Sequence, residues 1–329
     1  MRLPNGLSPV VIPYCEKNEL GIVPRQVYKR SWLIDILPSF KGYVNGKPNK
    51  LLYNFYSLVT TFLHASGKAV KKESGDVTSW SIKGCYLTRP AVGQDTEPPS
   101  FNDHTLVSLA YKGWSARSFE ILSDKMRANL QWVSDGAYKS VAWILDQGTG
   151  GTSVYRFGIL NKVLVTVAKD QTVTIRINIF EPWTKNMGYL LGGVLTDQNL
   201  LGLVDTGGNT HDIRANDHNS NVVAGATRIV IGTGTNPFSF DDYYLESMTE
   251  IPTSRGFLVA SDYSYALAYW TSSYVPPSEM TISEIGLVQS LYSSDGSTYD
   301  ALMCRIVLSE PITLVPNKTN FIMIRLLAM

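Results

Sequence analysis

The sequence predicts a mainly β protein made of two tandem jelly-roll-like antiparallel β-sandwich domains, related by internal duplication and each carrying a short helix. Two observations lead to this prediction. The chain is rich in Tyr, Ser, Thr, Val, Ile and Gly, a mixture that favours strands and turns over helices. Similar segments also recur in the same order in its two halves. With 329 residues, the chain is long enough for two domains of ordinary size.

Residues 1–27 are expected to form an extended N-terminal arm. They carry four prolines and show no apolar periodicity, and proline fixes φ and lacks a backbone N–H. Such an arm either lies along its own domain or reaches onto a neighbouring subunit. The same prolines interrupt the apolar core that a signal peptide needs, and no apolar run approaches the ~18 residues of a membrane span. We therefore expect neither export nor a membrane span.

The first predicted repeat covers residues 28–182. It opens with a strand within Gln26–Leu37, where apolar side chains alternate. A short amphipathic helix follows, with Asn54 as its expected N-cap and with apolar residues at helical spacing: Phe55, Leu58, Val59, Phe62 and Leu63. The remainder alternates strand segments with turns every ~8–12 residues, as in a sandwich or barrel. Its last hairpin is expected to turn at Lys169-Asp170.

The second predicted repeat covers residues 183–329, because the same elements return in the same order. A helical pattern starts again at Asn186, 132 residues after Asn54. A hairpin-like segment and several strand segments follow, and the closing hairpin is expected to turn at Asn317-Lys318. Chance similarity between two β-rich stretches does not preserve order. A unit of this length is also too long for a solenoid repeat, so each unit is expected to be a domain.

The clearest match between the halves is VGQDTEPPSFNDHTL (Val92–Leu106) with IGTGTNPFSFDDYYL (Ile231–Leu245). Asp103 and Asp242 lie 139 residues apart in this pair. Two carboxylates could act together as an acid and a base if the halves faced each other. The favoured interpretation is structural, because an Asp in this position can accept backbone N–H bonds and hold a turn.

The sequence contains no motif of a nucleotide-binding loop, a serine hydrolase or a zinc protease, so we expect a protein that is not an enzyme and that binds no cofactor. A net charge of +1 gives no general attraction for nucleic acid. Cys15, Cys85 and Cys304 are widely spaced and odd in number, so buried free thiols are expected instead of disulfides or a zinc site.

One polar segment, THDIRANDHN, gives weak candidates for a metal site. Imidazole and carboxylate groups can hold a divalent ion, and the segment supplies His211, Asp212, Asp217 and His218. The favoured alternative is a solvated loop. No bound metal is therefore expected.

Aromatic side chains are the other candidate contacts, since they make up 11% of the chain. In the segment DYSYALAYWTSSY they alternate with small polar residues. Exposed Tyr and Trp can stack on sugars or form a subunit interface, which makes Tyr263, Tyr265, Trp270 and Tyr274 candidates. The favoured alternative is that they fill the core of a sandwich.

Three segments of the second half, IVIGTGTNPFSFDDYYL, TISEIGL and PITLVPNKTNFIMIRLL, carry a resemblance. Their order of turns and strands resembles β-sandwich structural proteins of prokaryotic viruses, among them capsid, turret or spike and tail-fibre components. The resemblance covers Ile229–Met329 and extends weakly to the first half, which lacks the Gly-Thr-Gly and the Glu. It is a pattern of turns and strands, and no functional residue carries over from it.

The resemblance implies a virion structural protein, a capsid or capsid-associated component that assembles in the host cytoplasm through its sandwich surfaces and its arm. Its expected partners are further copies of itself and other virion proteins. For a major capsid protein of the tandem jelly-roll type, the resemblance implies a trimer with a pseudo-sixfold outline. The alternative is a spike or tail-fibre protein that recognises a glycan on the host surface. A glycan-cleaving enzyme is disfavoured, because acid and base signals are lacking.

Overall fold

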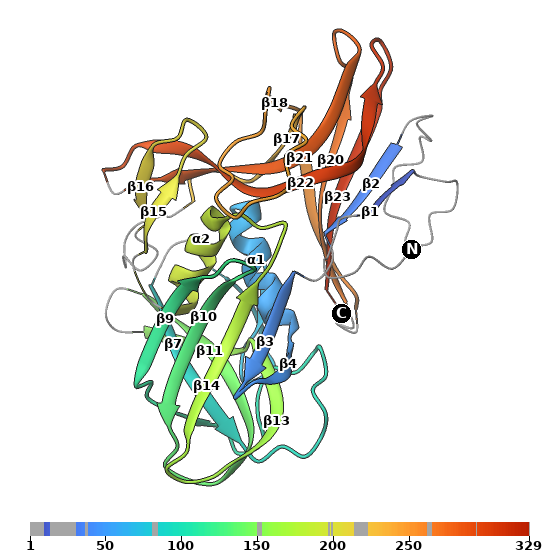
Figure 1. The fold of residues 1–329 in the computed structure, drawn as a ribbon. Coiled ribbons are helices and arrows are strands. Elements are labelled where there is room, and N and C mark those ends of the chain that lie inside the picture. The colour runs from blue at the N-terminus through green and yellow to red at the C-terminus, as the bar shows by residue number, and fades with distance from the viewer. Residues whose placement is uncertain are drawn as a thin grey trace.

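The computed structural model gives the protein a mainly β fold with two helices of 12 residues, α1 (Tyr53–His64) and α2 (Lys185–Thr196) (Figure 1). This confirms the predicted class, antiparallel β-sandwich with short helices. Neither of these helices is long and apolar enough to cross a membrane, and the residues described contain no other candidate. The structure describes residues 10–13, 31–36, 39–80, 85–149, 153–196, 198, 200–213, 223–261, 265–293 and 295–328.

The first sandwich, at the bottom of Figure 1, is one curled sheet of ten strands. These strands are β3 (Phe40–Val44), β4 (Lys47–Leu51), β7 (Cys85–Gly93), β8 (Ala110–Tyr111), β9 (Ala116–Ile121), β10 (Met126–Val133), β11 (Tyr138–Thr149), β12 (Ser153–Ile159), β13 (Asn161–Val167) and β14 (Thr172–Ile179). They pair in the order β8-β7-β11-β13-β4-β3-β14-β10-β9, with β12 also on β11. Successive side chains of a strand point to opposite faces of the sheet, so every second residue of β14 faces the core: Val173, Ile175 and Ile177 are all fully buried.

The second sandwich, at the top of Figure 1, consists of two separate sheets. One sheet has the order β1-β2-β23-β20-β19 and the other has the order β18-β17-β21-β22. The strands are β1 (Val10–Pro13), β2 (Ser31–Ile36), β17 (Arg228–Gly232), β18 (Thr249–Glu250), β19 (Ser254–Val259), β20 (Ala266–Tyr274), β21 (Met280–Tyr292), β22 (Thr298–Leu314) and β23 (Asn320–Ala328).

Strand neighbours correspond between the two sandwiches. The run β8-β7-β11 matches β18-β17-β21, and the run β9-β10-β14 matches β19-β20-β23. In both sandwiches a two-stranded hairpin follows the helix: β5 (Ala69–Lys71) with β6 (Val77–Ser79), and β15 (Leu200–Val204) with β16 (Thr210–Ile213). The closing hairpins turn where expected, at Asp170 with φ 64° and at Asn317 with φ 56°.

The start of the chain departs from the predicted domain boundaries. β2 was expected to open the first sandwich, but it pairs in parallel with β23 of the second, with Ile34 opposite Ile324. Arg325 joins the two strands through Nε and Nη2, at 2.7 Å and 2.9 Å from the Asp35 carboxylate. Residues 28–182 are therefore not one sandwich, because side-chain alternation alone does not say which sheet a strand joins. Most of the predicted arm, residues 1–27, lies outside the described residues; Val10–Pro13 form β1, which pairs with β2.

Both helices lie between the two sandwiches (Figure 1). Helix α1 comes from the first half, yet its last turn is capped by the second: Thr227 donates to the Leu63 carbonyl from its backbone N at 2.8 Å and from its Oγ1 at 2.7 Å. Helix α2 comes from the second half and packs against strands of the first sandwich. A Cβ at Gly188 would collide with Met126 on β10, and one at Gly192 would collide with Phe119 on β9, so these glycines allow α2 to lie directly on the first sandwich.

The two halves consequently share one hydrophobic core. A single cluster of buried side chains runs from Phe40 and Trp132 in the first sandwich, through Leu58 and Leu190 on the helices, to Trp270 in the second. The two predicted repeats, 28–182 and 183–329, therefore both contribute side chains to one buried cluster. Each helix fills the end of the opposite sandwich, which joins the two into one block.

Each helix carries an Asn near its start that binds the backbone of the following hairpin. Asn54 Nδ2 donates to the Lys71 carbonyl at 3.0 Å, and Lys71 N donates to Asn54 Oδ1 at 2.9 Å. Asn186 makes the same two bonds with Val204, at 2.8 Å and 3.0 Å. Asn54 is therefore not the expected N-cap, a position taken by Leu52, but an anchor between helix and hairpin.

Candidate functional site

The matched segments form the same turn in both sandwiches. Asp103 Oδ2 accepts a hydrogen bond from Ser100 N at 3.0 Å, and Asp242 Oδ2 accepts one from Ser239 N at 2.8 Å. The structural interpretation of these two aspartates is thereby confirmed. Each carboxylate also binds a buried cation within its own sandwich.

In the first sandwich the cation is Lys162 on β13, and we call the group Lys162, Asp95 and Asp103 the Lys162 centre. Lys162 Nζ lies 2.8 Å from Asp95 Oδ1 and 3.1 Å from Asp103 Oδ2. Asp95 Oδ2 accepts further bonds from Ser140 Oγ at 2.6 Å and Val107 N at 3.1 Å. Burial acts to raise the pKa of Asp95, but the hydrogen bonds from Lys162 and Ser140 outweigh it and hold the pKa below its usual range.

In the second sandwich the cation is Arg305 on β22, and the group Arg305, Glu284 and Asp242 is the Arg305 centre. Arg305 Nε lies 2.7 Å from Glu284 Oε2, and its Nη1 lies 2.8 Å from Asp242 Oδ2. Glu284 is fully buried, and its Oε1 accepts bonds from Gly234 N at 3.1 Å and Glu246 N at 2.6 Å. The matched turn, through Asp242, and strand β21, through Glu284, thus both bind the Arg305 guanidinium.

Both centres have the chemistry of structural ion pairs. Backbone N–H groups, a hydroxyl or the buried cation already bind their carboxylate oxygens, and the Asp95 carboxylate is held in the charged form. A general acid or base instead needs a pKa near the working pH and access to substrate. Desolvation acts to lower the pKa of Lys162, but its bonds to the two aspartates outweigh this effect and raise the pKa above its usual value. The ammonium group therefore stays charged.

The predicted metal candidates are only partly described. Asp217 and His218 lie outside the described residues, and Asp212 is exposed. His211 turns to a different carboxylate, with its Nε2 2.8 Å from Asp205 Oδ2, and its ring stacks on Tyr299 at 3.8 Å. The structure brings together no group of three metal-binding side chains among the residues it describes.

Of the predicted aromatic contacts that the structure describes, one is buried and two are half-buried. Trp270 is fully buried, its Nε1 donates to Thr227 Oγ1 at 2.6 Å, and the His64 ring lies perpendicular to its ring with the centroids 5.1 Å apart. Trp270 therefore follows the core interpretation and is not a surface contact, because its position on β20 points into the shared core. Tyr265 and Tyr274 are half-buried, and Tyr263 lies outside the described residues.

Sequence reasoning missed Trp114, whose exposed fraction is 42%. It lies between β8 and β9, and the guanidinium of Arg117 sits 4.2 Å from its ring centre. The flanking Gly113 and Ser115 gave a turn signal that could have placed this tryptophan outside the core. Among the cysteines, Cys304 is confirmed as a buried free thiol, and burial raises its pKa.

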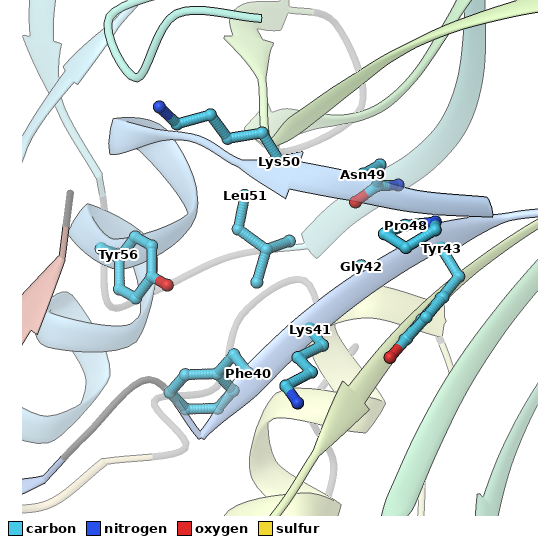
Figure 2. Close-up of a pocket in the computed structure, with 9 residues that line it drawn as sticks. All are labelled: Phe40, Lys41, Gly42, Tyr43, Pro48, Asn49, Lys50, Leu51 and Tyr56. Atoms are coloured by element: carbon cyan, nitrogen blue, oxygen red, sulfur yellow. The ribbon is translucent and has the colours of Figure 1, made fainter.

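A hollow opens between β3 and β4 at their ends nearest α1, and Figure 2 shows its lining. Its volume is about 170 Å³, and an adjoining hollow of about 360 Å³ lies on the other side of Pro48, Asn49 and Lys50. Phe40, Leu51 and Tyr56 are buried, whereas Lys41 and Lys50 are exposed at its rim. Burial also raises the pKa of Tyr56 to about 12, so its hydroxyl stays protonated.

Comparison of the chain with protein-family models, with curated proteins and with solved structures gives no match. The functional argument therefore rests on the geometry described above and on the sequence.

Proposed function

We propose that the protein is a non-enzymatic structural subunit of a virion, a capsid or capsid-associated component that assembles with copies of itself. One observation supports this proposal best: two similar sandwiches are joined into one block. Each helix packs against the opposite sandwich, and the two sandwiches share a common core. Two similar units in one chain present related surfaces to their neighbours, which suits a symmetric shell. Assembly in the host cytoplasm, contacts with other virion proteins and a trimeric state belong to the same proposal.

Two sheet edges that pair with no further strand among the described residues supply surfaces for such contacts. β9 and β19 end their sheets at corresponding positions, and all residues of both strands are exposed or half-buried. An unpaired edge can bind a strand of another chain. Val10–Pro13 already pair in this way with β2 of their own chain.

We further infer that the two halves arose by duplication. The corresponding strand neighbours, the Asn anchors and the Asp turns support this inference. If it is correct, superposing β7, β10, β11 and β14 on β17, β20, β21 and β23 should bring Asn54 onto Asn186 and Asp103 onto Asp242. Separation of those pairs after superposition would contradict it.

Assembly of the purified protein tests the virion role. We expect higher-order particles by light scattering and electron microscopy at high concentration, and we expect deletion of residues 1–27 to reduce them. The variant's circular dichroism and unfolding midpoint serve as controls for folding. A full-length protein that stays monomeric under all assembly conditions would count against the proposal.

A spike or tail-fibre protein that binds a host glycan is the second candidate. The exposed Trp114 favours it, because an exposed aromatic ring offers a stacking surface for sugars. Loss of glycan-array binding on Trp114→Ala would support this candidate. Copy number per particle separates the two roles, with hundreds expected for a shell subunit and tens for a spike.

A further inference from the structure

The two parts of the chain carry opposite net charge. Residues 37–182, which form the first sandwich, α1 and its hairpin, contain 17 Lys and Arg against 11 Asp and Glu, a net charge of +6. Residues 183–329 contain 7 Lys and Arg against 14 Asp and Glu, a net charge of −7, and residues 1–36 add +2. The near-neutral total of +1 therefore results from two oppositely charged parts, and copies of such a molecule attract one another head to tail.

The outer face of the first sandwich collects cations on the neighbouring strands β3, β14 and β10 (Figure 1). Side chains that alternate with the core residues point outward, namely Arg127 and Asn129 on β10, and Arg176 and Asn178 on β14. Lys41 on β3 lies opposite Asn178 and is exposed. We call Arg127, Arg176 and Lys41 the cationic face.

Both arginines of the cationic face are held in place by the asparagine on the opposite strand. Arg127 Nε donates to Asn178 Oδ1 at 3.2 Å, and Arg176 Nε donates to Asn129 Oδ1 at 3.2 Å. These bonds use Nε and leave the terminal nitrogens, of which Arg127 Nη1 has a distant carboxylate, 3.7 Å from Glu120 Oε2. Arg176 forms no ion pair with another described residue. Positioned guanidinium groups of this kind bind carboxylates well.

The second sandwich carries exposed acids around the start of β21. Glu279 immediately precedes this strand, and Glu310 lies on the neighbouring strand β22. Glu246 follows the matched turn, and its backbone N donates to Glu284 Oε1 of β21 at 2.6 Å. We call Glu246, Glu279 and Glu310 the acidic end. All three are exposed, and none forms an ion pair with another described residue.

The chain does not use this complementarity within itself. The cationic face lies on the first sandwich and the acidic end on the second, and no ion pair among the described residues joins the face to the second sandwich. A carboxylate-rich surface that fits the face is therefore present on every other copy of the protein. Complementary charges of this kind steer two proteins together and fix their orientation.

We propose that the cationic face binds the acidic end of a neighbouring copy of the chain. Such a head-to-tail contact is heterologous, so each copy keeps one cationic face and one acidic end for further copies. The contact closes into a ring or extends into a larger array, depending on the rotation between neighbours. The inference rests on the proposed assembly of the protein with copies of itself, for which it names the surfaces.

Salt tests the contact in the full-length wild-type protein. Sedimentation velocity in about 0.1 M and about 1 M sodium chloride compares Debye lengths of about 10 Å and about 3 Å. We expect self-association to weaken at least about tenfold at the higher concentration, because the charges of the two surfaces are then screened from each other. Association of equal strength at both concentrations would overturn the proposal.

Charge reversal in two separate variants identifies the surfaces. Arg127→Glu with Arg176→Glu makes the face acidic, and Glu246→Lys with Glu279→Lys and Glu310→Lys makes the end basic. Each variant alone should associate at least about tenfold more weakly than the wild-type protein. An equal mixture of the two should recover association, because the altered face of one then meets the altered end of the other, and their unaltered surfaces also fit.

A matched control changes the same amount of charge elsewhere on the first sandwich. Lys139 on β11 and Lys169 in the turn after β13 are exposed and lie outside the cationic face, so Lys139→Glu with Lys169→Glu should leave association nearly unchanged. Unfolding midpoints check that the variants fold. If the double change at the face does not fold, Arg176→Gln replaces it, and the salt dependence of the wild-type protein applies in any case.

The outcomes separate this contact from the virion role. Unchanged association of a folded face variant, or no recovery in a mixture of folded variants, would overturn the contact while assembly itself continues. A wild-type protein that stays monomeric would overturn both. Binding of a single-stranded DNA oligomer that the face variant loses, with self-association unchanged, would assign the face to a polyanion and would also overturn the proposal.

Discussion

The two sandwiches solve the same structural problem with different residues. Each ties its matched turn to the adjacent sheet through a buried cation with two carboxylates: Lys162 with Asp95 and Asp103, and Arg305 with Glu284 and Asp242. Asp103 and Asp242 occupy the same position in the two sequences, but the other two carboxylates do not. Asp95 comes from a loop and Glu284 comes from strand β21.

The positions involved show an exchange between the two halves. Ser140 on β11 lies opposite Gly93, and Glu284 on β21 lies opposite the corresponding Gly232. The residue that corresponds to Asp95 is Gly234, 139 positions later. One half therefore pairs a loop carboxylate with a strand serine, and the other pairs a strand carboxylate with a loop glycine.

The carboxylate reaches the same backbone group in both cases. Asp95 accepts from Val107 N and Glu284 accepts from Glu246 N, and these two donors are again 139 residues apart. A Cβ at Gly234 would lie 2.6 Å from Glu284 Oε1, so the loop can carry no side chain where the strand supplies the acid. The comparison teaches that the fold requires a carboxylate at this place and accepts it from either element.

The largest expected effect is at the Arg305 centre. Glu284→Gln should lower the free energy of unfolding by about 3–5 kcal/mol, because it leaves a buried guanidinium with one charged partner instead of two. Urea unfolding followed by fluorescence measures the change. Asp241→Asn, in the exposed pair with Lys185, is the matched control and should cost about 0–1 kcal/mol. Similar effects of the two variants would contradict a structural role for the buried centre.

The Lys162 centre should respond less strongly to the same kind of change. Asp95→Asn should cost about 2–3 kcal/mol, because Lys162 keeps Asp103 and the amide oxygen can still accept from Val107 N. The same urea experiment applies, with Asp135→Asn in the exposed pair with Lys112 as the control. A loss as large as that of Glu284→Gln would show that the two centres are equivalent after all.

Transplanting one arrangement into the other half tests the exchange directly. Glu284→Ser should destabilise by removing the acid, and Gly234→Asp should destabilise by crowding Glu284 with a like charge. The double variant restores one carboxylate from the loop, so it should be more stable than the sum of the single changes by about 1–3 kcal/mol. A double-mutant cycle of unfolding free energies measures this coupling, and strict additivity would rule the exchange out.

The smallest expected effect is a difference at high pH. The folded-state pKa of Lys162 is raised, so its contribution to stability is full below the unfolded value of about 10.4 and is lost as the pH rises through the folded value. Arg305 stays protonated throughout this range. Lys162→Arg should therefore reduce the loss of stability as the pH rises above about 10.4, and Arg305→Lys should increase it. Urea unfolding at a series of pH values measures this difference. It would be contradicted if the free energy of unfolding fell equally with rising pH in the wild-type protein and both variants.

Local features of the chain could be predicted from the sequence alone. Alternating apolar residues placed the strands, and the turns at Asp170 and Asn317 were found because short polar pairs between alternating segments mark hairpins. The Asp turns were also predictable, since Asp103 and Asp242 bind backbone atoms only three residues away. The two helices were located by their period, although the N-cap of α1 was not.

Which side chains are buried and which are exposed was harder to predict. Trp270 and Trp114 are both tryptophans in turn- and strand-rich segments, yet one is fully buried and the other is exposed. Burial depends on which elements lie over a residue, and those elements are far away in the chain.

By itself, therefore, the sequence determined the strands, the turns and the recurrence of the same elements in two halves, because these depend on residues a few positions apart or on similarity at a constant offset. Only the tertiary structure decided that β2 joins the second sandwich, that the helices cross into opposite halves, and that Asp95 and Glu284 do the same work from different elements. Those outcomes depend on contacts between residues up to 290 positions apart, as between Asp35 and Arg325, and periodicity carries no information about such contacts.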